Sequence, residues 1–406
     1  MTRQASPKPR LLIIGGTNLL QRGNHRIHHL VAHLRRWGYA LDLVGHVNYR
    51  EVRTQPASEP VRGPRAGAAG PMLSVEAQGD DRLLVVRKPP AVAGRLAQDL
   101  LSYALLRRRL SRYPVCVYGH PGNSVLAYLL QRAAVALRVV YDDWDYFPVH
   151  STTVRGRMDA RELAWRERLS VRQADAVVSV SSVLARLRES QGAKRVLVAA
   201  NGVDGEFFGR AESGRTASHP PTLIFVGSLF RAWGVDLAIE SLPLIHRSLP
   251  TVRFLVVGSG PEEAALRALA RRSPSLGEAV EFQGRQDYIR LPDHLARADV
   301  GVVTYRDEEF VRYSSSLKAL EYMAAGLPVL GTRVGETARL VEESGAGLLV
   351  DFSPEAFAAA ALRLFQDRRI YDGCRKSARQ CAAEHSWERT LEPVRELVGR
   401  FAAETS

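Results

Sequence analysis

Short apolar runs alternate along this chain with longer segments in which apolar residues recur every three or four positions. Runs of the first kind predict buried strands, and the longer segments predict amphipathic helices. In the first half of the chain we expect strands at Leu11–Ile14, Ala40–Val44, Leu83–Val86, Val115–Tyr118, Val139–Tyr141, Ala176–Val180 and Val196–Ala199. The helices expected between them span residues 24–37, 94–112, 122–137, 157–173 and 182–190.

A second cycle of the same pattern follows a polar stretch, Gly209–Pro221, which we expect to link two domains. Its strands are expected at Leu223–Val226, Phe254–Val257, Val280–Gln283, Val300–Thr304, Val329–Gly331 and Gly347–Val350. Strands that alternate with helices build parallel sheets covered on both faces, so the fold class is α/β with two Rossmann-like domains. Ligands of such domains bind beyond the carboxyl ends of the strands. Residues 54–71, rich in Pro, Gly and Ala, predict a loop.

Composition narrows the class of protein. The chain has 406 residues, 46% hydrophobic and 24% charged, which is enough to bury two cores. No apolar run reaches the roughly 18–20 residues that span a bilayer, and the first apolar run is too short for a signal peptide. The three cysteines, Cys116, Cys374 and Cys381, argue against a disulfide framework and a four-cysteine zinc site. They fit a reducing cytoplasm, where we expect the protein.

Charge is distributed unevenly. The formal net charge is +13, made up of +16 in residues 1–200 and −3 in residues 201–406. The first half therefore favours an anionic partner such as a membrane surface or an acidic acceptor. The alternative is an arginine-rich proteome with ordinary solvated helix faces, since only five of the basic residues are lysines. We find no aromatic-interleaved basic motif or helix-turn-helix pattern, so no nucleic acid partner is expected.

The segment Ser314–Val329 carries the clearest chemistry. Its serines are good caps for a helix, whose N-terminus offers N–H groups and partial positive charge to a phosphate. Lys318 adds a full charge in the first turn, and Glu321 lies on the same face three residues later, placed to accept hydrogen bonds from two ribose hydroxyls. The alternative is a capping box, which needs Ser or Thr where Lys318 stands.

With these residues the chain resembles the retaining glycosyltransferases of family 4, which have the GT-B fold. The donor-site motif of that family is similar to Ser314–Val329, and Gly15-Gly16 after the first strand resembles its glycine-rich loop. Further matches follow in the expected order at Asn201-Gly-Val-Asp204, Gly227–Asp236, Val257–Glu263, Phe282-Gln-Gly-Arg285 and Gly326–Val329. The resemblance covers nearly the whole chain and is densest from residue 200 to 350.

The resemblance implies roles for individual residues. Glu321 would bind the ribose of a nucleotide-sugar, and the Ser316 region and Lys318 would face its diphosphate. His120, which follows a strand, stands where the family has a histidine that contacts the transferred sugar; a purely structural histidine is the alternative. The residues expected to act in catalysis are His120 and Lys318, and those expected to bind the donor are Gly15, Gly16, Ser228, Arg231, Gly258, Gly260, Arg285, Ser316, Lys318 and Glu321.

The resemblance also implies an architecture and a reaction. An acceptor-binding domain would span residues 1–208 and a donor-binding domain residues 209–385, with their parallel sheets facing a cleft. A last helix within residues 386–406 would return to the first domain. The reaction would retain the anomeric configuration, with a UDP- or GDP-linked sugar as co-substrate and neither a metal nor another cofactor.

Three positions depart from the family pattern. Tyr313 stands where the family often has an acid that holds the donor sugar, which leaves Glu308 or Glu309 as substitutes. Ser228 and Trp233 stand where the family usually has Arg and Lys to clamp the phosphates. Either Arg231 replaces them or Lys318 carries most of the charge. These departures place the chain in a divergent branch, and they motivate a second hypothesis, a non-catalytic protein that binds nucleotide-sugars.

The segment Tyr141–Phe147 combines three carboxylates with four aromatic rings and follows a strand. Rings stack on sugar faces and carboxylates accept from hydroxyls or attract amines, so we expect it to line an acceptor pocket. The acceptor-binding residues would be Asp142, Asp143, Trp144, Asp145 and Tyr146. A folded loop with aromatic packing is the alternative. The pattern Asp143-Trp-Asp145 also resembles the metal-binding motif of transferases with the other major fold, which gives a third, metal-dependent hypothesis.

The helix expected near residues 94–113 carries Arg107, Arg108, Arg109 and Arg112 beside several leucines. Such a helix can lie on an anionic membrane or bind an acidic acceptor, and an ordinary surface helix is the alternative. We therefore expect a small-molecule or lipid-linked acceptor and, with it, a cytoplasmic protein in peripheral contact with the inner membrane face.

Overall fold

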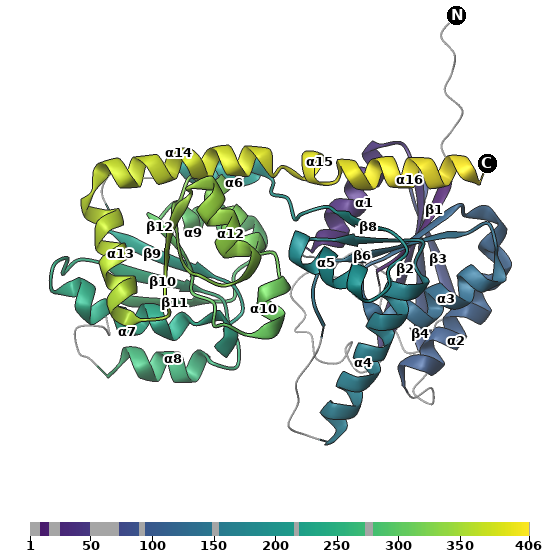
Figure 1. Cartoon of the computed structure of the whole chain (residues 1–406), viewed down its shortest axis with the longest axis horizontal. Coiled ribbons are helices and arrows are strands. Elements are labelled where there is room, and N and C mark those ends of the chain that lie inside the picture. The colour runs from purple at the N-terminus through teal and green to yellow at the C-terminus, as the bar shows by residue number, and fades with distance from the viewer. Residues whose placement is uncertain are drawn as a thin grey trace, which may run out of the picture. The chain divides into compact units, whose positions relative to one another are not determined.

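The computed structural model describes residues 9–15, 25–48, 73–88, 94–147, 154–214, 219–272 and 279–405. The chain divides into two compact units, residues 1–199 with 391–406, and residues 200–390 (Figure 1). Each unit is a sheet with helices on its faces.

The first unit contains an eight-stranded sheet in the order β3-β4-β2-β1-β5-β6-β7-β8. Its strands are β1 (Arg10–Ile14), β2 (Ala40–Asn48), β3 (Leu73–Gln78), β4 (Asp81–Lys88), β5 (Val115–Tyr118), β6 (Arg138–Asp143), β7 (Ala176–Ser179) and β8 (Val196–Val198). Its helices are α1 (Arg26–Arg36), α2 (Arg95–Leu106), α3 (Ser124–Ala133), α4 (Val154–Gln173), α5 (Ser182–Ser190) and α16 (Glu392–Glu404), with 3-10 turns η3 (Arg107–Arg112) and η4 (Pro121–Asn123).

The seven strands expected in this unit are present, and β3 is an addition that makes the sheet mixed instead of parallel. β3 pairs antiparallel with β4 through a turn at Gly79, whose φ of 63° is in the left-handed region. Its sequence Leu-Ser-Val-Glu-Ala-Gln alternates apolar and polar residues, as an edge strand does, and lacks the continuous apolar run that marks the other strands. The expected loop at 54–71 lies outside the described residues.

The second unit contains a fully parallel six-stranded sheet in the order β11-β10-β9-β12-β13-β14. Its strands are β9 (Thr222–Val226), β10 (Arg253–Val257), β11 (Val280–Gly284), β12 (Val300–Val303), β13 (Val329–Thr332) and β14 (Gly347–Val350). Its helices are α6 (Gly205–Ser213), α7 (Val235–His246), α8 (Glu263–Ala270), α9 (Leu291–Leu295), α10 (Glu309–Tyr313), α11 (Leu317–Ala324), α12 (Gly335–Ser344), α13 (Pro354–Gln366), α14 (Arg368–Glu384) and α15 (Trp387–Thr390), with 3-10 turns η5 (Arg231–Trp233) and η7 (Tyr288–Arg290).

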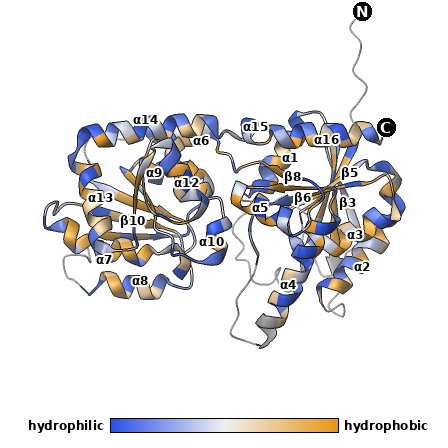
Figure 2. Cartoon of the chain, viewed as in Figure 1, coloured by the Kyte–Doolittle hydropathy of each residue, from blue (hydrophilic) through white to orange (hydrophobic). Residues whose placement is uncertain are grey.

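Buried apolar residues fill both faces of the central strands in each unit. In Figure 2 these strands are mainly hydrophobic in colour, while the helices mix hydrophilic and hydrophobic residues. In the second unit, for example, Phe225 and Phe254 lie in the core below α7 and α13, and Ile224 and Leu255 lie in the core below α9 and α11. This burial on both faces explains why the strands are short apolar runs in the sequence.

The units divide at residue 199, nine residues before the boundary suggested by the polar stretch 209–221. The reason is α6, whose Phe208 and Ala211 are buried in the core of the second unit with Leu255 and Tyr305. The chain passes back to the first unit at residue 391. There α16 packs through Phe401, whose ring lies 5.8 Å from the guanidinium carbons of Arg138 and of Arg195.

Two strand ends of the second unit approach each other so closely that one glycine has no room for a side chain. A Cβ on Gly258 would stand 1.8 Å from the carbonyl oxygen of Gly227, and its φ of 143° is one that L side chains rarely adopt. We predict that Gly258→Ala lowers the free energy of unfolding by about 2–3 kcal/mol, because the two loops must separate. Urea denaturation of the full chain measures this loss.

Gly373→Ala is the matched control for this prediction. Gly373 lies within α14, and a Cβ there meets nothing within 4 Å. Alanine in a helix interior is expected to raise stability by about 0.5–1 kcal/mol. Equal denaturation midpoints for Gly258→Ala and the unchanged chain would contradict the close packing of the two loops.

None of the helices in the described ranges combines the length and the apolar character that crossing a bilayer requires.

Candidate functional site

The carboxyl ends of β9, β10 and β12 meet at one edge of the second sheet, where α11 begins. Ser316 is the N-cap of α11, and its hydroxyl accepts a hydrogen bond from the Ala319 N–H at 3.4 Å. The hydroxyl of Tyr305, which lies just after β12, donates to the same oxygen at 2.9 Å. The Asn201 side chain donates to the Ser315 carbonyl at 3.0 Å, which ties the preceding turn to the start of the unit. The helix N-terminus is therefore held firmly at the edge where ligands of such sheets bind.

Lys318 places its ammonium inside a cluster of aromatic rings. Nζ lies 4.6 Å from the ring centre of Phe225, 4.8 Å from that of Trp233 and 5.2 Å from that of Tyr305. We call these three residues the ring cage. It stabilises a cation through the negative faces of the rings but removes much of its water. Burial accordingly lowers the pKa of Lys318 to about 7, against the opposing effect of Glu321.

The ring cage depends on Trp233, which is fixed from two sides. Its indole N–H donates to the Ser228 hydroxyl at 3.2 Å, and its carbonyl accepts from the Thr304 hydroxyl at 3.2 Å. Gly234 follows with a φ of 60°, and a Cβ there would stand 1.9 Å from the Thr304 carbonyl oxygen. From the sequence alone, Trp233 is notable only because the family that the chain resembles usually has a cation in this loop. In the structure the Trp233 ring packs against the Lys318 ammonium.

Glu321 lies one turn further along α11, on the same side as Lys318, and is only 8% exposed. Tyr288 of η7 donates to Glu321 Oε1 across a long 3.5 Å contact. The Tyr288 ring stacks on Phe207 of α6, with 5.2 Å between ring centres and 7° between planes. Burial and the carboxylate raise the pKa of Tyr288, so its hydroxyl stays a donor. Neither Tyr288 nor Phe207 belongs to a motif, and their spacing in the sequence gives no signal for this contact.

The remaining residues of the second unit that are expected to bind a donor differ in which groups they offer to a ligand. Gly258 and Gly260 follow β10 and contribute backbone alone, because a side chain on Gly260 would stand 2.5 Å from Leu229 backbone atoms. Ser228 follows β9 and is already hydrogen-bonded to Trp233. Arg231 in η5 and Arg285 after β11 have exposed side chains. The structure thus brings Ser228, Ser316, Lys318 and Glu321 to one sheet edge and leaves the side chains of Arg231 and Arg285 exposed.

In the first unit, Gly15 follows β1 and donates its N–H to the Val44 carbonyl at 3.2 Å. Gly16 lies outside the described residues. His120 follows β5, at the same carboxyl edge of this sheet, and is the N-cap of η4. Its Nδ1 accepts from the Gly122 N–H at 2.9 Å, which assigns the proton of the neutral ring to Nε2. Burial, with smaller contributions from Arg95 and Arg166, lowers the pKa of His120 to about 4, so the ring is neutral at pH 7.

Arg166 of α4 supports the turn that carries His120. It is fully buried, and its Nη1 donates to Asp99 at 2.6 Å and to the Gly122 carbonyl at 3.0 Å. The turn is therefore pinned through both the carbonyl and the N–H of Gly122. Arginine buried in mid-helix gives no signal in the sequence, because the pattern of α4 predicts only a polar surface helix there.

The acidic and aromatic segment after β6 divides into a structural and an accessible part. Asp142 is 2% exposed and pairs with Arg26 Nε at 2.9 Å, and Asp143 is fully buried and held by Arg188 at 2.8 and 3.0 Å. These two expected acceptor ligands are therefore corrected to structural ion pairs, because both carboxylates are committed inside the unit. Trp144, Asp145 and Tyr146 remain partly exposed.

The same ion pair bears on the metal hypothesis. Both oxygens of Asp143 face the Arg188 guanidinium, and the Ser179 hydroxyl adds a hydrogen bond at 3.1 Å. A metal at Asp143 and Asp145 would have to displace a buried cation that also pairs with Glu167. Removing a partner from such a pair is strongly unfavourable, so this part of the chain is not built for that role.

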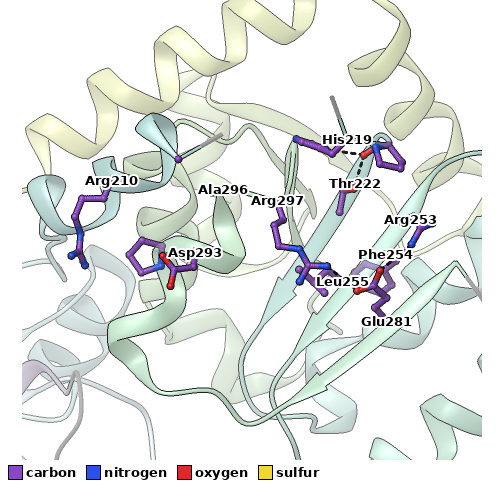
Figure 3. Close-up of a pocket in the computed structure, with 13 residues that line it drawn as sticks. Arg210, His219, Thr222, Arg253, Phe254, Leu255, Glu281, Asp293, Ala296 and Arg297 are labelled. Atoms are coloured by element: carbon purple, nitrogen blue, oxygen red, sulfur yellow. Dashed lines mark hydrogen bonds and ion pairs between the residues drawn. The ribbon is translucent and has the colours of Figure 1, made fainter. Parts of the chain in front are cut away.

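A separate pocket of about 530 Å³ lies at the opposite, amino-terminal edge of the second sheet (Figure 3). It is lined by the first residues of β9 and β10, Thr222 and Arg253, together with residues of α9 and its surroundings. Arg253 and Arg297 both pair with Glu281 there, at 3.1 and 2.9 Å. None of the residues expected to bind donor or acceptor lines this pocket.

Comparison with known proteins finds similar sequences. A family model described as glycosyl transferases group 1 matches residues 220–367. Glycogen synthase of Mycobacterium tuberculosis is 29% identical over 250 residues, which cover 59% of this chain and 58% of that protein. D-inositol 3-phosphate glycosyltransferase of Geodermatophilus obscurus is 32% identical over 258 residues, covering 59% of this chain and 56% of that protein. These matches thus span less than two thirds of the curated relatives.

Solved structures extend the similarity of fold to the whole chain. Sucrose-phosphate synthase from Thermosynechococcus elongatus superposes with a TM-score of 0.71 at 21% identity, covering 98% of this chain and all of that one. A trehalose-6-phosphate enzyme of Escherichia coli, solved with UDP-2-fluoro glucose bound, superposes with a TM-score of 0.68 at 14% identity, covering 96% of this chain and 98% of that one. Such identities establish a shared fold.

Proposed function

We propose that this chain, which belongs through residues 220–367 to the glycosyl transferases group 1 family and has the expected GT-B fold, transfers a glycosyl group from a nucleotide-sugar to an acceptor. The second unit would bind the donor and the first unit the acceptor. The observation that carries the proposal is the first turn and a half of α11. There a capped helix N-terminus, the Lys318 ammonium and the Glu321 carboxylate occupy one sheet edge.

This arrangement matches the chemistry of a nucleoside diphosphate. The helix N-terminus and Lys318 supply positive charge for the two phosphates. Glu321 supplies two acceptor oxygens for the ribose hydroxyls, with Tyr288 against one side of it. These contacts do not select a base or a sugar, because UDP- and GDP-linked donors both contain the ribose and the diphosphate.

The proposed reaction requires the protein to position the donor and the acceptor and to stabilise the charge of the leaving diphosphate. The bond between the anomeric carbon and the donor phosphate oxygen breaks, and a bond from the anomeric carbon to the acceptor oxygen forms. In the retaining mechanism that we propose, the acceptor proton passes to the departing phosphate on the same face. Lys318 and the α11 N-terminus stabilise the negative charge that grows on the diphosphate, so no metal is required.

His120 is proposed to bind the transferred sugar as a hydrogen-bond donor. Its Nδ1 is engaged by the Gly122 N–H, so Nε2–H is the atom that can donate to a sugar hydroxyl. We predict that His120→Asn lowers kcat about tenfold and leaves donor affinity unchanged, since one hydrogen bond in the transition state is lost. Asparagine is a good cap and keeps the turn. Steady-state kinetics with calorimetric donor titration test this, and an unchanged kcat would make His120 a purely structural cap.

The acceptor is proposed to contact Trp144, Asp145 and Tyr146, the accessible part of the segment after β6. The two rings can stack on a sugar or another ring, and the carboxylate can bind a hydroxyl or an amine, which fits a small-molecule acceptor. The positive charge of residues 1–200 fits a lipid-linked acceptor with an anionic group. Both classes remain within the proposal.

One observation favours a second candidate, a protein that binds nucleotide-sugars without transferring them. Trp233 and Ser228 replace the cations that members of the family use around the phosphates. The deciding experiment incubates the purified chain with a panel of UDP- and GDP-sugars and a cell extract as the acceptor source, and follows release of nucleoside diphosphate. Donor-dependent release supports transfer. Calorimetric binding without release supports the second candidate, and neither binding nor release overturns both.

A further inference from the structure

Two helices of the first unit expose large apolar side chains. On α2, Leu96 and Leu100 are 53% and 51% exposed, and on α4, Met158 and Trp165 are 66% and 49% exposed. The helices are joined at the surface by Arg95, whose guanidinium lies 3.8 Å from Asp159 and 3.3 Å from Glu162. Below the surface, Asp99 of α2 pairs with Arg166 of α4 at 2.6 Å. The two helices that carry the four apolar side chains are therefore tied to each other.

Along α4, five of the exposed residues form a stripe of apolar and basic side chains. Met158, Arg161, Trp165, Arg168 and Arg172 are all exposed and follow one another at intervals of three or four residues, which places them on one side of the helix. Leu96 and Leu100 are one turn apart on α2. We call Leu96, Leu100, Met158, Arg161, Trp165 and Arg168 the α2/α4 face.

Three acids near this face, Asp99, Asp159 and Glu162, share two arginines, Arg95 and Arg166. Asp159 and Glu162 pair with Arg95, and Asp99 is buried beneath Arg166. The 3-10 turn that continues α2 adds exposed Arg107 and Arg108. Arg161 and Arg168 exceed the one acid that these pairs leave over, so among the described residues the α2/α4 face carries net positive charge around its apolar side chains. It lies in the half of the sequence that carries a formal charge of +16.

We propose that the α2/α4 face docks on the surface of an anionic lipid bilayer. Leucine and methionine would enter the acyl boundary, Trp165 would lie at the headgroup level, and the long arginine side chains would reach the phosphates. A bilayer fits basic and apolar side chains that are spread over two helices, because it offers an extended anionic surface above an apolar layer. Docking does not require glycosyl transfer, so its test needs no donor.

The experiment is flotation of the full chain with vesicles of pure phosphatidylcholine or of phosphatidylcholine with 30% phosphatidylglycerol. We expect binding to the anionic vesicles alone, weakened by salt. Trp165→Ser with Leu100→Ser is expected to weaken it at least tenfold, through loss of apolar burial. Arg161→Glu with Arg168→Glu is expected to weaken it more than twentyfold, since each basic residue contributes about fivefold near such a surface.

Ile289→Ser is the matched control, because Ile289 is 64% exposed but lies in the second unit. It should bind like the unchanged chain. All three variants alter exposed side chains, and circular dichroism with thermal melting confirms that they fold. Equal binding to neutral and anionic vesicles, or variants that bind normally, would overturn the proposal. So would a dimer, found by analytical ultracentrifugation, that Trp165→Ser dissociates while no vesicle binds, since the face would then join two chains.

Discussion

Replacing Lys318 by methionine is expected to lower kcat/KM for glycosyl transfer about a thousandfold while the chain remains folded. Under the proposed mechanism Lys318 supplies positive charge to the bound diphosphate at the N-terminus of α11, and removing such a group from a water-poor site costs two to three orders of magnitude. Methionine has a similar length, and its sulfur packs well against aromatic rings, so the ring cage stays filled. Kinetics and thermal melting of the variant measure the two effects separately.

The control is Lys376→Met, which removes an exposed lysine from α14 in the same unit. A loss of less than threefold for Lys318→Met would show that the diphosphate charge is carried elsewhere, for instance by Arg231.

The lowered pKa of Lys318 gives this prediction a pH dependence. Without a donor the ammonium loses its proton near pH 7. The diphosphate favours the charged form, so binding above pH 7 must draw a proton from solution. Donor affinity is therefore greatest below pH 7 and falls by up to tenfold per unit above it. The same shift makes the donor-free fold gain stability as the pH rises from 7 towards 10.5, because the unfolded chain keeps the proton longer. Calorimetry at pH 6, 7 and 8 should find this slope, and Lys318→Met should abolish it.

The second large effect is expected at Glu321. Glu321→Ala should weaken binding of a nucleoside diphosphate about a hundredfold. Two hydrogen bonds to a charged carboxylate contribute about 1.5–3 kcal/mol each, and water that enters the variant site recovers part of this loss. The loss should appear in donor affinity and only weakly in kcat, because the ribose is remote from the bond that breaks. Titration calorimetry with the chain's own donor nucleotide measures it.

The ribose assignment has an internal check. A 2′,3′-dideoxy nucleoside diphosphate lacks the hydroxyls that Glu321 is proposed to bind, so Glu321→Ala should bind it as the unchanged chain does. Glu240→Ala, which removes an exposed glutamate from α7, is the control for a general loss of negative charge. A hundredfold loss with both nucleotides would mean that Glu321 maintains the site instead of contacting the ribose.

The strands and the chemistry of single loops were accessible from the sequence. Leu223–Val226 and Val300–Thr304 are strands because they are apolar on both faces, and the structure has them as β9 and β12 within one residue at either end. The strand β3 was not predicted, because half of its residues are polar and it pairs antiparallel at the edge of the sheet. The boundary suggested by the polar stretch differs from that of the compact units, because the stretch does not reveal that Phe208, just before it, is buried in the second unit.

The sequence by itself determined the alternation of buried strands and helices apart from β3, the N-terminus of α11 and the two charged residues on it, since caps, periodicity and spacing are local properties. Only the tertiary structure decided what surrounds them. The ring cage of Lys318 joins residues from β9, η5 and the end of β12, and Asp143 is withdrawn by Arg188, 45 positions away. Burial and the partners of a charge depend on contacts between segments that are distant along the chain, and no local pattern encodes them.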